Sequence, residues 1–126
     1  MAKYDFRIDV QPEFLPAQSA PGQDVYTFSY TITITNTGEV PAQLISRHWL
    51  ISDASGTTEE VKGLGVVGHQ PLLKPGEAFQ YTSGCRLRAA SGVMRGSYFF
   101  VAEDGERFDI AIAAFDLTAP SGRVLH

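Results

Sequence analysis

The residues of this chain that come closest to a known chemical motif are three glycines in the segment Gly63-Leu64-Gly65-Val66-Val67-Gly68. They match the Gly-x-Gly-x-x-Gly pattern, whose backbone approaches a pyrophosphate at a helix N-terminus. A dinucleotide-binding fold needs a helix after the third glycine, but His69-Gln70-Pro71 follows and Pro75-Gly76 comes soon after. Residues 78–102 also lack the acidic residue that would bind ribose. The pattern therefore indicates a loop built for tight turns or close packing, with an anion-binding nest of free N–H groups as the alternative.

Three arginines, Arg86, Arg88 and Arg95, lie in the same acid-free segment and make it locally basic. Arg86 and Arg88 are two residues apart, so they would project from one face of a strand. An ordinary solvated face is one interpretation, and a surface for an anion or an acidic partner beside the glycine segment is the other. The candidate ligand or partner surface consists of Gly63, Gly65, Gly68, His69, Gln70, Arg86 and Arg88.

A second group of chemically capable residues is Ser46-Arg47-His48-Trp49, in the middle of a predicted strand. Alternation along a strand places Arg47 and Trp49 on one face and His48 on the other. We expect Trp49, the single tryptophan, to lie in the core. Acid–base chemistry at His48 would need a carboxylate partner, which the sequence alone does not reveal.

The chain has one cysteine, Cys85, and three histidines, at positions 48, 69 and 126. Cys85 could be a nucleophile activated by His48 or His69, but a buried structural thiol is the commoner role. The histidines show no ligand spacing such as His-x-x-x-His. We therefore predict a protein without enzymatic activity, with no catalytic residue, no cofactor and no tightly bound metal.

The elements that position these residues are predicted to be strands. In Tyr26–Ile34, aromatic and branched residues alternate with Ser and Thr, which is the period of a half-buried strand. Strand-like segments also occur at Phe6–Val10, Gln43–Ser52, Ser97–Ala102 and Phe108–Ala114. Turn residues separate them, at Asn36-Thr37-Gly38, Asp53-Ala54-Ser55-Gly56, Pro75-Gly76, Ser91-Gly92 and Asp104-Gly105.

This pattern predicts an all-β fold, an antiparallel sandwich of about seven strands with fibronectin type III or immunoglobulin-like Greek-key connections. A length of 126 residues and a hydrophobic content of 44% predict one domain, residues 1–126. The net charge of -4 argues against binding to duplex nucleic acid or an anionic membrane. The lone cysteine and the absence of a signal-peptide or membrane-spanning pattern predict a cytoplasmic location.

Three segments together resemble the bacterial ApaG family: residues 43–53 (QLISRHWLISD), residues 63–71 (GLGVVGHQP), and residues 75–85, in which Pro75-Gly76-Glu77 leads into Phe79 and Tyr81. The similarity extends over nearly the whole chain, with His69 as one small departure. The resemblance implies a fibronectin type III-like sandwich and a cytoplasmic protein without an established catalytic activity. It also implies an association with magnesium and cobalt efflux phenotypes, and an operon shared with a diadenosine tetraphosphate hydrolase.

The resemblance further favours a role in protein binding, because related domains occur in eukaryotic F-box proteins and in a polymerase delta-interacting protein. We expect a non-enzymatic protein-interaction module whose partner is unknown and for which a homodimer is one form. The alternative is a weak nucleotide or pyrophosphate binder that uses the glycine segment and nearby arginines. An uncharacterised hydrolase is the third hypothesis.

Overall fold

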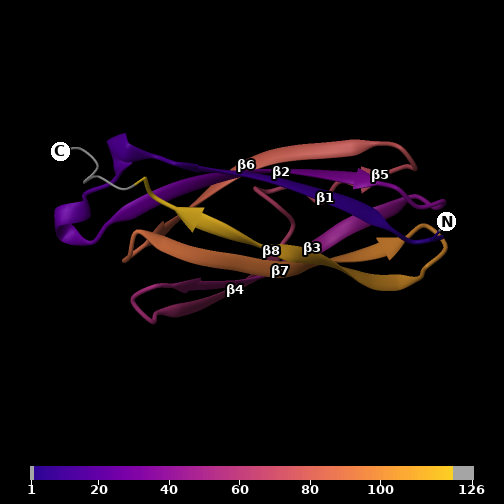
Figure 1. Cartoon of the computed structure of the whole chain (residues 1–126). Helices are drawn as coiled ribbons and strands as arrows, with labels where there is room; N and C mark the ends of the chain where they lie inside the picture. The colour runs from indigo at the N-terminus through magenta and orange to yellow at the C-terminus, as the bar shows by residue number, and fades with distance from the viewer. Residues whose placement is uncertain (1, 121–126) are drawn as a thin grey trace.

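The computed structural model describes residues 2–120, which form eight strands and two short 3-10 helices (Figure 1). The strands are β1 (Phe6–Phe14), β2 (Tyr26–Asn36), β3 (Ala42–Asp53), β4 (Thr58–Leu64), β5 (Leu72–Leu73), β6 (Ala78–Leu87), β7 (Ser91–Ala102) and β8 (Arg107–Thr118). The helices η1 (Pro16–Gln18) and η2 (Pro21–Gln23) lie in the connection between β1 and β2.

The strands form two antiparallel sheets that lie as two layers in Figure 1. One sheet has the order β1-β2-β6, and the other has the order β4-β3-β7-β8, with β5 paired to the beginning of β3. The chain returns to the first sheet with β6 after β3, β4 and β5 have built part of the second. These connections confirm the predicted Greek-key sandwich. The strand number is eight rather than about seven because the two-residue β5 adds a short pairing to β3.

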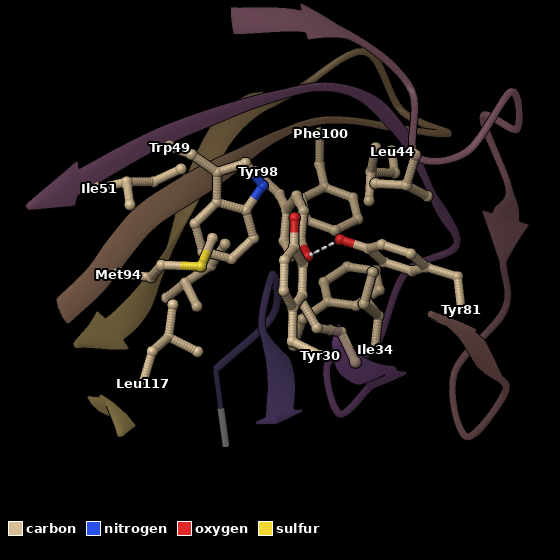
Figure 2. Packing of buried hydrophobic residues seen from close by; sticks show 14 of the residues in the cluster. Tyr30, Ile34, Leu44, Trp49, Ile51, Tyr81, Met94, Tyr98, Phe100 and Leu117 are labelled. Carbon is tan, nitrogen blue, oxygen red and sulfur yellow. Dashed lines mark hydrogen bonds between the residues drawn. The ribbon is translucent and has the colours of Figure 1, made fainter. Parts of the chain in front are cut away.

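The core lies between the sheets and follows the alternation of the strands. Along β2, Tyr30, Ile32 and Ile34 point inward and are buried. Trp49 on β3 is only 2% exposed, which confirms its predicted place in the core. The hydroxyl groups of Tyr81 on β6 and Tyr98 on β7 form a 2.5 Å hydrogen bond that joins the two layers (Figure 2).

One predicted turn, Ser91-Gly92, lies within a strand in the structure. Ser91 and Gly92, predicted to form a turn, are the first residues of β7. A methyl group on Gly92 would lie 2.7 Å from the Ser52 carbonyl oxygen. Gly92 is therefore needed for close approach to β3 rather than for chain reversal.

The two long sides of the sandwich differ. On one side, here called the closed side, β1 contacts β8, and Phe6 stacks on Phe100 with ring centroids 4.0 Å apart. Phe100 in turn stacks on Phe108 at 5.5 Å. The other side, here called the open side, is flanked by the edge strands β4 and β6. The sequence-predicted site residues lie on the open side or at its ends.

Candidate functional site

The glycine segment is the end of a strand followed by a tight turn. Gly63 and Leu64 are the last residues of β4. The N–H of Val66 donates to the His69 carbonyl at 2.8 Å, and the N–H of His69 donates to the Val66 carbonyl at 2.9 Å. Between them, Val67 and Gly68 have φ angles of 42° and 86°. Positive φ at both central residues is the requirement of a type I′ turn, which reverses the chain between β4 and β5.

Two of the three motif glycines are required by their surroundings. Gly65 has a φ of 65°, and a methyl group there would lie 2.5 Å from the His69 carbonyl oxygen. Gly63 lies opposite Arg47 in the β3–β4 pairing. A methyl group on Gly63 would lie 2.9 Å from the Arg47 guanidinium, which fills the space that a side chain at position 63 would need.

Arg47 holds the segment in place. Its Nη1 atom donates to the carbonyls of Leu64 at 3.0 Å and Gly65 at 2.9 Å. Gln70 donates through its side-chain amide to the Ile45 carbonyl at 2.9 Å. The His69 ring lies beside the Phe79 ring at the beginning of β6, with centroids 5.6 Å apart. The segment is thus pinned to β3 and β6 by side chains.

A phosphate-binding nest would need free backbone N–H groups in this segment. The N–H of Gly65 already donates to the Ile45 carbonyl at 2.8 Å. Those of Val66 and His69 donate to each other's carbonyls, as described above. Three N–H groups of the segment are thus already used, which favours the tight-turn interpretation of the glycines over a pyrophosphate cradle.

The predicted arginines lie elsewhere. Arg86 is near the end of β6 and Arg88 follows it, where the Arg88 N–H donates to the Asp53 carboxylate at 3.2 Å. Both side chains are exposed, and both line the same shallow pockets with Thr57. Phe79, which contacts His69, is seven residues from Arg86 along β6, a separation of roughly 23 Å. The structure brings Arg86 and Arg88 together but does not bring them to the glycine segment.

Exposed hydrophobic side chains gather at the glycine segment. Leu64, Val67 and Leu72 are 74%, 51% and 55% exposed, and we call these three side chains the apolar edge. Leu64 pairs with Ser46 and Leu72 pairs with Gln43, so they lie about 10 Å apart along one side of β3. In the part of the chain that the structure describes, Val93 is the only other exposed large hydrophobic residue.

His48 has the carboxylate partner that the sequence could not reveal. On the outer face of the β4-β3-β7-β8 sheet, its Nε2 atom lies 2.6 Å from Glu60 Oε2. This contact, and Lys62 at 3.9 Å, hold the pKa of Glu60 below its ordinary value. Ser97 lies directly opposite His48 on β7, but no hydrogen bond joins the two among residues 2–120. The arrangement lacks a nucleophile that is activated by the histidine.

Cys85 is half-buried on β6, with its Sγ atom 3.9 Å from the Met94 sulfur. Burial, and next the charge of Glu59, raise the pKa of the thiol to about 11. A thiol with this pKa is protonated near neutral pH, which agrees with the structural role expected from the sequence. Within residues 2–120, no group of three or more His, Cys, Asp or Glu side chains could hold a metal ion, and no helix is long and apolar enough to cross a membrane.

Comparison with known proteins gives one consistent result. The model of the ApaG domain matches residues 16–102. Protein ApaG of Acidovorax sp. (strain JS42) is 67% identical to this chain, and Protein ApaG of Ralstonia nicotianae is 57% identical, with all of both chains covered in each case. The crystal structure of an ApaA protein from Bordetella pertussis is 54% identical, with a TM-score of 0.92, over 94% of this chain and 97% of that one.

Proposed function

This chain belongs to the ApaG domain family, which is not named for an enzymatic activity, and on that premise we propose that it is a non-enzymatic module that binds a protein partner. The partner docks apolar side chains against the apolar edge. The observation that carries this proposal is the exposure of Leu64, Val67 and Leu72 within nine residues of chain. Clustered exposed hydrophobic groups on a soluble fold mark interaction surfaces more often than isolated ones do.

The backbone at Val67 supports the same proposal. A β-branched residue at a φ of 42° is an outlier, because its side chain crowds the backbone in the left-handed region. The usual residues at this turn position are Asn, Asp and Gly, which adopt that conformation at lower cost. A strained valine at an exposed turn tip has a use if the side chain itself is recognised.

The chemistry of the edge strand indicates how the partner is held. β4 carries Glu59, Glu60 and Lys62, all exposed. Charges on an edge strand discourage the addition of a further strand. We therefore infer docking of side chains onto the apolar edge rather than extension of the sheet.

Weak nucleotide or pyrophosphate binding is the second candidate, and the motif of Gly63, Gly65 and Gly68 is what favours it. Its support is weaker because three N–H groups of the segment already donate to the backbone. Nucleotide-dependent protection against thermal unfolding distinguishes this candidate from a protein-binding module.

The test is crosslinking in the native cell with a photoreactive phenylalanine analogue at position 67, and at exposed Ala113 on β8 as the matched control. We expect a discrete crosslinked species at position 67 that is absent at position 113. Leu64→Ser combined with Leu72→Ser should remove it while the melting temperature stays within a few degrees. The mass of the species separates a second copy of this chain from another protein. Identical crosslinks at both positions, or crosslinks unaffected by the serine variant, would refute the proposal.

A further inference from the structure

The open side of the sandwich contains a slot of about 360 Å³ between β4 and β6. Tyr30 on β2 and Trp49 on β3 contribute aromatic rings to it. Val61 lines it from β4, and Ser83 and Cys85 line it from β6. The volume is near the lower end of the range for small-molecule sites, which suits a compact ligand.

Trp49 brings to the slot a polar group without a protein partner. Trp49 is 2% exposed, and its indole N–H donates to no acceptor among residues 2–120. Every fully buried side-chain nitrogen or oxygen in this part of the chain has a partner, so the indole N–H must open to solvent. Trp49 lines the slot. The indole N–H is the one hydrogen-bond donor that this ring offers to a ligand.

Tyr30 contributes a phenol ring to the same slot. Tyr30 is 6% exposed, and Ser83, which also lines the slot, lies opposite it on β6. Figure 2 shows the Trp49 nitrogen on the side of the indole ring that faces the tyrosine hydroxyl groups. The lining residues thus provide three uncharged donors, which are the indole N–H and the hydroxyl groups of Tyr30 and Ser83.

The charged residues of the slot favour an anion. Arg47 and Arg86 both line it, and Glu59 is the single acidic residue that does so. Within the described part of the chain, no ion pair joins Glu59 to either arginine. The lining therefore carries a net charge of one positive unit, and guanidinium groups bind planar carboxylates with two parallel hydrogen bonds.

We propose that this slot binds a small organic carboxylate, whose apolar body packs on the Trp49 and Tyr30 rings and whose charge pairs with the guanidinium groups of Arg47 and Arg86. The indole N–H of Trp49 donates to the ligand. A phosphate dianion fits less well, because Glu59 lines the same cavity and the net charge of the lining is only one. Arg47 also donates to the Leu64 carbonyl, but none of the three side chains of the apolar edge lines the slot, so this site does not depend on the protein-binding proposal.

The single tryptophan makes the test direct, because ¹⁵N-labelled protein gives one indole N–H signal. The probes are acetate, hexanoate, phenylacetate and indole-3-acetate, each with its uncharged amide, and inorganic phosphate, all titrated up to ~10 mM. We expect hexanoate, phenylacetate or indole-3-acetate to shift the indole signal saturably, with the matching amide at least tenfold weaker. The same carboxylate should slow alkylation of Cys85, which lines the slot.

Three variants sharpen the test. Arg86→Gln should weaken carboxylate binding at least tenfold, and Val61→Phe should abolish it by filling the slot. Arg95→Gln is the matched control, because Arg95 is an exposed arginine that does not line the slot, and it should bind as the parent does. The proposal is overturned if no carboxylate shifts the signal, if amides or phosphate bind as tightly, or if Arg86→Gln binds unchanged.

Discussion

The gap between the two sheets is filled differently along the two long sides of the sandwich. On the closed side, Phe6, Phe100 and Phe108 stack in sequence between β1, β7 and β8 and seal the sheets together. On the open side, β4 and β6 leave a slot lined by Trp49, Tyr30 and two arginines. Aromatic residues thus line both sides, but on the open side they stand with two arginines around a slot.

This difference separates stability from recognition within one small fold. Stacked phenylalanines contribute buried area and favourable ring contacts and leave no polar group to satisfy. The residues around the slot bury less apolar area, but their indole, phenol and guanidinium groups can form directed hydrogen bonds with a ligand. Substitutions on the closed side should therefore lower stability, whereas exposed substitutions on the open side should change binding at little cost to stability.

The largest expected effect comes from emptying the core. Phe100→Ala and Trp49→Ala should each lower the free energy of unfolding by ~3–5 kcal/mol, because both side chains are almost completely buried. That is a large share of the ~5–15 kcal/mol typical of such domains. Urea denaturation measures the change, with Leu72→Ala, on the apolar edge, as the exposed control expected to change stability by less than ~1 kcal/mol. If Phe100→Ala melts within a few degrees of the parent, the closed side is not the stabilising side.

A smaller effect tests whether the glycine segment is built for structure. Gly65→Ala should cost ~2 kcal/mol or more, because its positive φ is unfavourable for alanine and the new methyl group would collide with the His69 carbonyl. Gly68→Ala should cost only ~1 kcal/mol, since it has positive φ but open space around it. Thermal unfolding of both variants gives the ranking. Equal stability of both variants and the parent would show that the segment changes conformation at low cost, as a ligand-binding loop would.

The sequence predicted the strands that have one buried apolar face and one polar face. It missed a strand whose residues are mostly exposed on both faces. Alternation located β2, because its inward residues are buried while Thr and Ser face outward. It did not locate β4 (Thr58–Leu64), an edge strand with mostly exposed residues. Glycine was ambiguous for a physical reason, since the close approach at Gly92 and a turn both require the absence of a side chain.

The candidate site was harder to predict than the fold because its contacts depend on strand register. Alternation along the strand correctly placed Arg47 and Trp49 on one face, but it could not show that Gly63 lies opposite Arg47. The His48–Glu60 contact depends on the same β3–β4 pairing. The pairing of a predicted β4 with β3 through the Asp53–Gly56 turn would have been the signal for both. The slot arises from the gap between two sheet edges, which no local pattern records.

The smallest effect on stability, and the sharpest on reactivity, concerns Cys85. Its thiol pKa of about 11 means that the folded state holds the proton well above the value of ~8.5 for an exposed thiol. The thiolate is the reactive form, so alkylation by iodoacetamide in the native protein should rise about tenfold per pH unit from pH ~7.5 to ~10. An exposed thiol levels off near pH ~9.5, because most of it is already ionised. Since the raised pKa favours the protonated folded state, the contribution of this thiol to stability is complete below pH ~8.5 and is lost as pH rises toward about 11.

Mass spectrometry of the alkylated protein over this pH range gives the apparent pKa, and urea-unfolded protein is the reference. Glu59→Gln should lower the apparent pKa slightly, because burial is the larger cause of the shift and the Glu59 charge the smaller. A plateau near pH ~9.5 in the native protein would mean that Cys85 is solvated like an ordinary surface thiol. Water would then reach the slot wall more easily than the structure shows. The packing of Cys85 against Met94 would be less tight than the packing on the closed side. A continued rise toward about pH 11 would instead place Cys85 in a desolvated wall, next to a slot that remains accessible to a small neutral reagent.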